Sequence, residues 1–341
     1  MKISICIPTF NGGKYIQQAL DSVMIQIEHV LEVIVLDDLS DDATVSIVES
    51  YQKRESKIRL ERSNKRLGMV QNWNRCAKVA RGELFSILHQ DDRYLEDYVV
   101  SMKKCFNDPV IDFAYCDVRT INNSDEIIKD EKFSIKQAVG NQRLSSCSEP
   151  YVWDASTFAK NLLNGCFVNC PTVVFKKKSF SAVGGFDARF EMVQDWEFWF
   201  RASSNGYKFA HLPKPLYDYR VHQENATSRY KKSFKKYEER EALLSEMFAV
   251  AKSNQWVESK DWNKVRKTLF NVLLWDALED LVVGRRRGFL EKLDYGDSCL
   301  DGFSSYPPRR IFPFIRILGP KMSSILMTLA RRFSKSILKF A

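Results

Sequence analysis

The stretch FSILHQDD, residues 85–92, is an apolar run that ends in two adjacent carboxylates, Asp91 and Asp92. Such a run predicts a buried strand, and the two acids follow at its carboxyl end, where open α/β sheets collect their ligands. Two neighbouring carboxylates repel each other unless a divalent cation neutralises them. The stretch therefore predicts a site for a metal and a nucleotide diphosphate. A solvated turn, in which aspartate bonds to its own backbone, is the alternative.

Strand-like and helix-like segments alternate around this stretch. Short β-branched runs predict strands at 3–7, 31–36, 57–60, 83–88 and 112–115. Apolar spacings of about 3.6 residues predict helices at 13–26, 42–51, 68–80, 94–106 and 153–163. The alternation indicates an α/β fold with a doubly wound, Rossmann-like, mostly parallel sheet that helices cover on both faces. Residues 119–150, rich in Asn, Ser, Lys and Glu, predict a mobile excursion.

A second pair of acids, Asp37 and Asp38, follows the strand predicted at 31–36. Helix capping accounts for Ser40 but not for an acid pair at a second strand end. A carboxylate at that place can accept a hydrogen bond from an imide or amino group of a nucleobase. After the first strand, Gly12 permits a tight bend close to a ligand. These strand ends predict a nucleotide site along one edge of the sheet.

The charge of the chain is concentrated near its C-terminus. The net charge is +9, and residues 303–341 contain eight Lys or Arg and no Asp or Glu. The basic residues are Arg309, Arg310, Arg316, Lys321, Arg331, Arg332, Lys335 and Lys339. The preceding residues are nearly neutral, with 44 basic residues (52 minus 8) against 43 acidic ones. A terminal basic segment mixed with apolar residues favours a membrane surface as partner and excludes a folded nucleic-acid-binding face.

Length and cysteine usage give the class of protein and its compartment. A chain of 341 residues predicts about two domains with ample material for a core. The eight cysteines lie far apart, which predicts reduced and mostly structural thiols. The first apolar run is too short for a signal peptide, and no stretch of about 18 uncharged apolar residues occurs. We therefore expect a cytoplasmic protein.

The last third of the chain is predicted to be helical. Helical patterns at 238–252 and 261–283 give a helical extension over 229–302, which follows a domain at 1–228. In the tail at 303–341, the apolar residues Ile325, Leu329, Phe333, Ile337 and Phe340 recur every three or four positions, opposite basic ones. This basic amphipathic helix predicts peripheral attachment to the inner face of the cytoplasmic membrane. A helix packed on the protein's own core is the alternative.

Eight motifs in sequence order resemble the family 2 glycosyltransferases. They are ICIPTFN (5–11), LDDLSD (36–41), NKRLGMVQNWN (64–74), ARGE (80–83), QDD (90–92), VGGFD (183–187), QDWEFW (194–199) and YRVH (219–222). Each motif is weakly specific alone, but together they cover about residues 1–228 in the order of the family. The resemblance implies a GT-A type fold, a nucleotide-sugar donor and a divalent metal, Mn or Mg.

The resemblance assigns five residues to the nucleotide. Pro8, Thr9 and Phe10 would border the nucleobase, which is expected to be uracil. Asp38 would hydrogen-bond that base, and Asp91 would approach the ribose and the metal.

The resemblance also assigns the metal. Asp92 would be the principal metal ligand, and His222 would lie near the metal or the diphosphate, where a neutral imidazole suits Mn. This chain departs from the family at His89, where many members carry another acid.

Asp195 is the expected catalytic base, because it matches the second acid of a pair of adjacent acids in the family. In this chain Gln194 replaces the first acid of that pair. The alternative is an ordinary acid at a helix N-terminus, favoured by the helix dipole. Glu197 is the second candidate for the base, and Trp196 is a candidate acceptor contact. A carboxylate at this place would take the proton of an acceptor hydroxyl.

The function implied is inverting transfer of a sugar from a nucleotide-diphosphate donor to a hydroxyl of a lipid-linked or glycan acceptor. Bacterial surface polysaccharide, such as O-antigen, capsule or lipopolysaccharide, is the expected product. Two other classes stay open. One is a catalytically degenerate sugar-nucleotide or glycan-binding protein, and the other is a nucleotidyltransferase on a related fold.

Overall fold

The computed structural model describes residues 1–131, 149–225, 233–282 and 284–299. The chain divides into two compact units, Met1–Leu162 with Cys166–Arg229, and Leu163–Gly165 with Tyr230–Ala341. The division after Arg229 lies next to the boundary expected after residue 228. The amphipathic tail at 303–341 lies outside the described residues.

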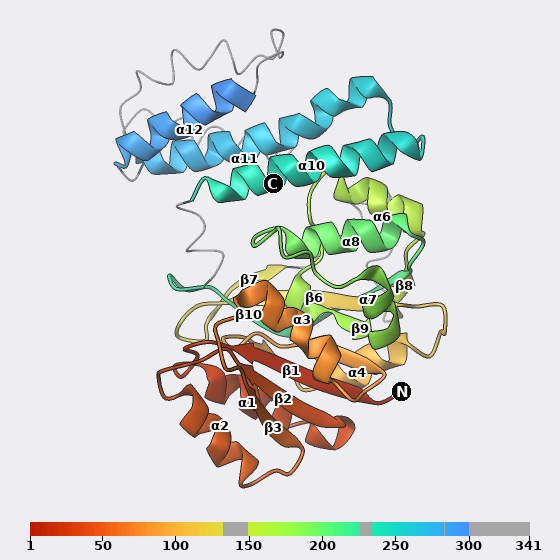
Figure 1. The fold of residues 1–341 in the computed structure, drawn as a ribbon, viewed down its shortest axis with the longest axis vertical. Coiled ribbons are helices and arrows are strands. Elements are labelled where there is room, and N and C mark those ends of the chain that lie inside the picture. The colour runs from red at the N-terminus through yellow and green to blue at the C-terminus, as the bar shows by residue number, and fades with distance from the viewer. Residues whose placement is uncertain (132–148, 226–232, 283, 300–341) are drawn as a thin grey trace. The chain divides into compact units, whose positions relative to one another are not determined.

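The first unit is built on a ten-stranded sheet, in which eight strands follow the order β3-β2-β1-β4-β9-β6-β10-β5 (Figure 1). The other two strands lie off this path, β7 paired with β6 and β8 paired with β10. The strands are β1 (Ile3–Thr9), β2 (Glu32–Asp37), β3 (Ile58–Arg62), β4 (Leu84–Ile87), β5 (Arg93–Tyr94), β6 (Phe113–Ile121), β7 (Ile127–Glu131), β8 (Tyr151–Val152), β9 (Val174–Lys176) and β10 (Phe209–Arg220). Strand β1 pairs in parallel with β2 and β4, β2 with β3, and β6 with β10. Strand β9 runs antiparallel to both β4 and β6, so these two strands point the same way. The prediction of a mostly parallel sheet is confirmed.

Helices flank this sheet (Figure 1). They are α1 (Ile16–Met24), α2 (Thr44–Gln52), α3 (Met69–Val79), α4 (Tyr98–Cys105), α6 (Ala155–Leu162), α7 (Lys177–Val183) and α8 (Gln194–Ser204). On one face, Ile3, Ile5 and Ile7 of β1 are fully buried in a cluster with side chains of α1, α2 and α4. On the other face, the Cys6 thiol lies 3.7 Å from the Cys76 carbonyl oxygen of α3. Because side chains alternate along a strand, burial on both faces accounts for the mostly apolar run at 3–7. The one polar side chain in this run, Ser4, is satisfied by donating a hydrogen bond to Glu32 at 2.8 Å.

Two segments differ from the sequence predictions. Residues 119–121 continue β6, and β7 pairs antiparallel with β6, so the start of the predicted excursion is a β-hairpin and the prediction is wrong there. The side-chain oxygen of Asn122 accepts the N–H groups of Ser124 and Glu126, so the polar residues form the turn. The helix predicted from residue 94 begins at Tyr98, because Tyr94 belongs to β5 and pairs with Tyr217. Residues 132–148 lie outside the described part of the chain.

The described residues of the second unit after position 233 are mainly helical, as predicted. The unit contains α10 (Lys235–Ser253), α11 (Trp262–Val282) and α12 (Arg286–Cys299), of which α12 was not predicted. Asp276 of α11 accepts hydrogen bonds of 2.6 Å from both Lys236 and the Tyr237 hydroxyl of α10, which fixes the pairing of these helices. Among the described residues, no helix is both long enough and apolar enough to cross a bilayer.

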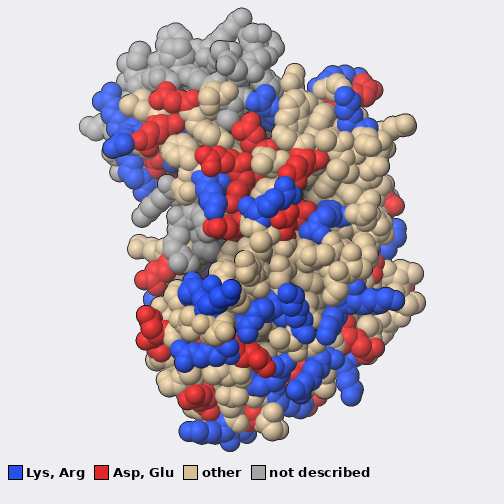
Figure 2. Space-filling model, viewed as in Figure 1, with Lys and Arg blue, Asp and Glu red and all other residues tan. Residues whose placement is uncertain are grey.

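Charges of both signs share the surface of the first unit. Figure 2 shows Lys and Arg side chains across the face in view, with Asp and Glu among them. A face made for nucleic acid gathers cations into one stripe. The mixture seen here is typical of a solvated surface.

Gly82, which precedes β4, gives a stability prediction. A Cβ at this position would lie 2.6 Å from the Leu84 carbonyl oxygen and 2.8 Å from backbone atoms of Lys2 and Ser4. Backbone atoms cannot yield, so we expect Gly82→Ala to lower the free energy of unfolding by about 3 kcal/mol, the upper end of overpacking costs. Denaturant unfolding measures the loss. Gly206→Ala is the control, because it has open space but φ +85, and should cost only about 1 kcal/mol. Equal losses would contradict the steric argument.

Candidate active site

The parallel strands bring four sequence-distant segments to one edge of the sheet. Thr9 at the end of β1 is in register with Asp37 at the end of β2, and Cys6 is in register with Ile87 of β4. Strand β10 ends at Arg220 in the same direction. This edge therefore carries both acid pairs, the loop after β1 and the residues that follow β10.

Asp91 and His222 form the closest acid–histidine contact at this edge. His222 Nε2 lies 2.8 Å from Asp91 Oδ2, and its side chain is 9% exposed. His222 Nδ1 is buried without a hydrogen-bond partner among the described residues. Burial opposes ionisation of Asp91, but the hydrogen bond of His222 and the charge of His89 lower the pKa of Asp91. Asp91 is thus held as a carboxylate beside an imidazole, which is a suitable donor pair for Mn.

Asp92 has its two oxygens engaged by the protein. The Tyr217 hydroxyl donates to Asp92 Oδ2 at 2.9 Å, and the Arg220 backbone N–H donates to Oδ1 at 2.7 Å. Burial and the neighbouring charge of Asp91 raise the pKa of Asp92 to about 6. The repulsion expected from the sequence is present, and the protein relieves it by holding the two carboxyl groups in different environments. Asp92 is less available to a ligand than Asp91.

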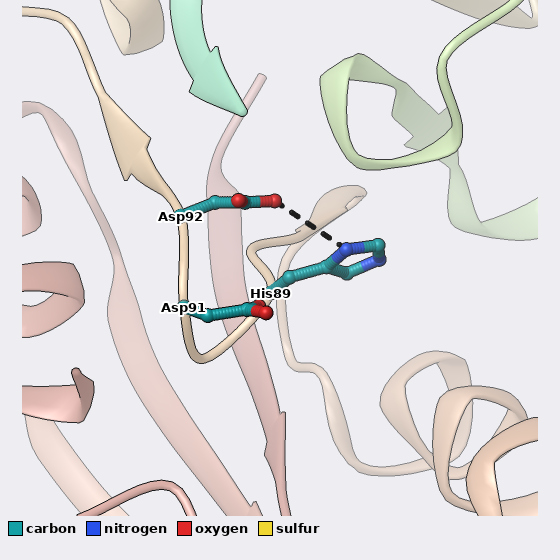
Figure 3. A group of neighbouring side chains, drawn as sticks. All are labelled: His89, Asp91 and Asp92. Atoms are coloured by element: carbon teal, nitrogen blue, oxygen red, sulfur yellow. Dashed lines mark ion pairs between the residues drawn. The ribbon is translucent and has the colours of Figure 1, made fainter. Parts of the chain in front are cut away.

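His89 lies on the same turn as the acid pair. Figure 3 shows its ring beside Asp92, with Nδ1 3.5 Å from Asp92 Oδ2. The ring stacks on Trp73 of α3 at a centroid distance of 4.9 Å. Burial works to lower the pKa of His89, but the Asp92 carboxylate, followed by Asp91 and Asp195, raises it. His89, Asp91 and Asp92 each offer one atom within 4.8 Å of the others, so this group could hold a metal.

Gln90 joins the ends of β1 and β4, a role that sequence reasoning missed. Its Oε1 accepts the Thr9 hydroxyl at 2.6 Å and the Phe10 N–H at 2.9 Å, and its Nε2 donates to the Phe10 carbonyl at 3.2 Å. A Cβ on Gly12 would lie 2.5 Å from Gln90 Oε1 and 2.7 Å from Thr9 Oγ1, so a larger residue there would displace the Gln90 side chain from these hydrogen bonds. The only sequence signal was the position of Gln90 directly before the acid pair.

Gln90→Ala should weaken nucleotide binding. Loss of three hydrogen bonds frees the Thr9–Phe10 loop, and a net cost of about 1.4 kcal/mol gives a tenfold rise in the Kd for nucleotide. Isothermal titration with UDP and Mn²⁺ measures this Kd. An unchanged Kd would show that the Thr9–Phe10 loop does not contribute to nucleotide binding.

The residues expected around the nucleobase lie at this edge, with different exposure. Pro8 is buried within β1, beside Leu36 of β2, whereas Phe10 is 36% exposed. The Arg66 guanidinium lies over the Phe10 ring at 3.2 Å from its centroid. Asp38 is 3% exposed, and its oxygens accept the backbone N–H groups of residues 67 and 68 at 2.7 and 2.9 Å. Asp38 thereby fixes the loop that begins α3.

Asp195 lies in the first turn of α8 and is half-buried. Its Oδ1 accepts the N–H of Trp196 at 2.8 Å, and its charge acts on His89 across the site. Glu197, the second candidate for the base, is paired through both oxygens with Arg201 at 2.6 and 2.7 Å. Because Arg201 also donates to the Gly185 carbonyl, Glu197 serves the packing of α8 against the loop after α7.

Trp196 is buried beside α6. Its side chain is 4% exposed, and its indole N–H donates to the Leu162 carbonyl of α6 at 3.0 Å. The geometry therefore does not favour the acceptor contact expected from the sequence.

The mixed sheet flanked by helices is a fold of the GT-A type, and the acid pairs lie at the strand ends where open α/β sheets bind their ligands. The chain belongs to glycosyl transferase family 2, whose family model matches residues 4–183, more than half of the chain. An uncharacterized glycosyltransferase of Rickettsia typhi is 30% identical over 71% of this chain and 70% of its own length. An uncharacterized protein of Mycobacterium tuberculosis is 30% identical over 58% of this chain. The chain spans 61% of that relative, less than two thirds of its length.

Solved structures share the fold at low sequence identity. TarS 1-349 of S. aureus in complex with UDP-GlcNAc has a TM-score of 0.54 and 17% identity, over 90% of this chain and 93% of that one. The mannosyltransferase PcManGT of Pyrobaculum calidifontis in complex with GDP-Man and Mn²⁺ has a TM-score of 0.56 and 15% identity, over 98% of this chain and 80% of that one. At such identities the likeness is one of fold. The predicted fold class is confirmed.

Proposed function

We propose that the chain is an inverting, metal-dependent transferase that moves a sugar from a UDP-sugar donor to an acceptor hydroxyl. The observation that carries the proposal is the contact of 2.8 Å between Asp91 and His222 at the strand edge where the nucleotide loop also ends. TarS 1-349 and PcManGT, which share this fold, are bound to UDP-GlcNAc and GDP-Man in their structures. These ligands support a nucleoside diphosphate sugar as the donor class. Asp38 and the loop of Pro8, Thr9 and Phe10 would meet the base.

Asp91 and His222 would hold a divalent metal, Mn or Mg, which when bound supplies charge that neutralises the leaving diphosphate. The donor set fits, because Asp91 is held ionised and His222 keeps a ring nitrogen, Nδ1, that is buried without a hydrogen-bond partner among the described residues. Asp92, the principal ligand expected from the sequence, would support this pair through its bonds with Tyr217 and the Arg220 backbone.

Asp195 would act as the base. It would accept the proton of the acceptor hydroxyl as the hydroxyl oxygen attacks the anomeric carbon and the bond to the diphosphate breaks on the opposite side. One displacement inverts the configuration at that carbon. Glu197 is a poorer candidate, because its carboxylate is occupied by Arg201.

A lipid-linked glycan at the inner face of the cytoplasmic membrane would be the acceptor, in the assembly of a bacterial surface polysaccharide. The support is the composition of residues 303–341, with eight basic and no acidic residues. Basic amphipathic segments bind anionic lipid surfaces.

Membrane attachment can be tested on the full chain by reversing four charges in the tail, Arg331, Arg332, Lys335 and Lys339, to Glu. We expect the native chain to float with vesicles that contain anionic lipid and the variant to stay behind. Neutral vesicles are the control for non-specific adsorption. Equal flotation of the two proteins with anionic vesicles would defeat the attachment hypothesis.

Release of nucleoside diphosphate from UDP, dTDP and GDP sugars tests the activity, with and without Mn²⁺ and with a bacterial lipid extract as acceptor. Release that requires both the metal and the extract is the expected result. A binding protein without activity would show a higher Tm with UDP and Mn²⁺ but no release. A nucleotidyltransferase would instead form pyrophosphate from a nucleoside triphosphate and a sugar phosphate. Neither release nor a Tm shift would refute the nucleotide and metal assignments together.

A further inference from the structure

The Arg220 side chain is fully buried at the end of β10, and its guanidinium joins three other segments. Its Nη2 donates to Gln18 Oε1 of α1 at 2.6 Å. Its Nη1 donates to the Asn122 carbonyl at 3.0 Å and to Asp125 Oδ1 at 2.6 Å, both in the β6–β7 turn. The ring of Tyr15 lies 4.8 Å from the guanidinium carbon. A buried charge with this many fixed acceptors adopts a single orientation.

Arg220 also donates two hydrogen bonds to the turn that carries Asp91 and Asp92. Arg220 Nε donates to the Asp91 carbonyl at 2.8 Å, and the Arg220 backbone N–H donates to Asp92 Oδ1 at 2.7 Å. His222 follows two positions later, and the intervening Val221 N–H donates to the Ile121 carbonyl at 2.9 Å. The backbone positions of Asp91 and His222 are therefore both tied to Arg220.

We propose that Arg220 is a positioning residue that sets the spacing between the Asp91 carboxylate and the His222 imidazole. The inference rests on the proposed function, since that spacing matters only if the pair holds a metal. A ligand pair keeps high metal affinity only while the surrounding hydrogen bonds hold both groups in place. The planar fork of Arg220 reaches four acceptors from three separate nitrogens, whereas the donors of a lysine ammonium all lie on one nitrogen.

Arg220→Lys tests the proposal, with the affinity for Mn²⁺ in the presence of UDP as the readout. Electron paramagnetic resonance of free Mn²⁺ gives the Kd of the folded protein directly. We expect the Kd to rise about 10- to 100-fold, the usual effect of losing an outer hydrogen-bond partner of a metal ligand. The KM for the metal should rise with the Kd, and saturating Mn²⁺ should restore most of kcat.

Arg201→Lys is the matched control. Arg201 also ties segments together, through Glu197 and the Gly185 carbonyl, but it does not belong to the turn of the acid pair. It should lower Tm and leave the Kd for Mn²⁺ unchanged. If Arg220→Lys raises the Kd no more than Arg201→Lys does, Arg220 serves the fold alone and the proposal is overturned.

Asp125→Gly provides a second test if Arg220→Lys does not fold. Asp125 has φ +65, which glycine adopts readily, and the substitution removes one acceptor of the guanidinium. The Kd for Mn²⁺ should rise about threefold or more, and an unchanged Kd would overturn the proposal. If the native chain binds no Mn²⁺ with UDP, the metal part of the proposed function fails, and this inference fails with it. If the native chain binds Mn²⁺ and neither variant weakens binding, only this inference fails.

Discussion

Asp195→Asn is expected to abolish sugar transfer while leaving the donor bound. The amide keeps the size of the side chain and can still accept the Trp196 N–H, so α8 should begin as before. It cannot take a proton from the acceptor hydroxyl, and general bases contribute roughly 10²–10⁴-fold to rates. We expect kcat to fall by about 10³-fold with the Kd for donor changed less than about threefold. Transfer assays with titration of the donor nucleotide measure both quantities.

Glu197→Gln is the control for this experiment, because it alters the neighbouring acid of the same helix turn. Loss of the ion pair with Arg201 should lower Tm, but kcat per folded molecule should stay within about threefold. Unchanged turnover in Asp195→Asn would remove Asp195 from the base role. A large loss in Glu197→Gln, without unfolding, would instead make Glu197 the base.

Asp91→Asn is expected to have the second large effect. The substitution removes the carboxylate that His222 contacts and leaves a weaker, neutral oxygen donor for the metal. Loss of a metal-bound charge commonly costs several kcal/mol of transition-state stabilisation, so transfer should fall by at least about 10²-fold. The Kd for Mn²⁺ should rise, and excess Mn²⁺ should recover part of the activity.

Asp92→Asn tests whether Asp92 binds the metal itself or only supports the Asp91 and His222 ligands. Because its oxygens accept from Tyr217 and the Arg220 backbone, its replacement should also reduce transfer, with a smaller rise in the Kd for Mn²⁺ than Asp91→Asn gives. A larger rise for Asp92→Asn would return Asp92 to the role of principal ligand that the sequence predicted.

Much of the fold could be predicted because buried parallel strands leave a strong sequence signal. The runs at 3–7 and 83–88 are mostly apolar, since helices cover both faces of β1 and β4. Strand β5 has only two residues, Arg93 and Tyr94, and its pairing with β10 depends on residues more than a hundred positions away. A segment of two residues is too short to show the alternation of a strand, so the sequence places these residues at the start of the following helix.

The position of the two acid pairs at neighbouring strand ends could be predicted, but the availability of each oxygen could not. Asp91 and Asp92 look equivalent in the sequence, and only the return of β10 shows that Tyr217 and the Arg220 backbone occupy Asp92. The same strand places His222 against Asp91. Trp196 was a candidate acceptor contact for a related reason, because an aromatic face fits a sugar as well as a core until its neighbours are known.

The central claim is that Asp91 and His222 hold a divalent metal beside a nucleoside diphosphate. The most direct measurement is anomalous diffraction from crystals of the full chain grown with UDP and Mn²⁺. We expect one strong manganese peak within coordination distance of Asp91 and His222, with the diphosphate against it. Bound UDP with no manganese peak at these two residues, or with the peak at other side chains, would contradict the account.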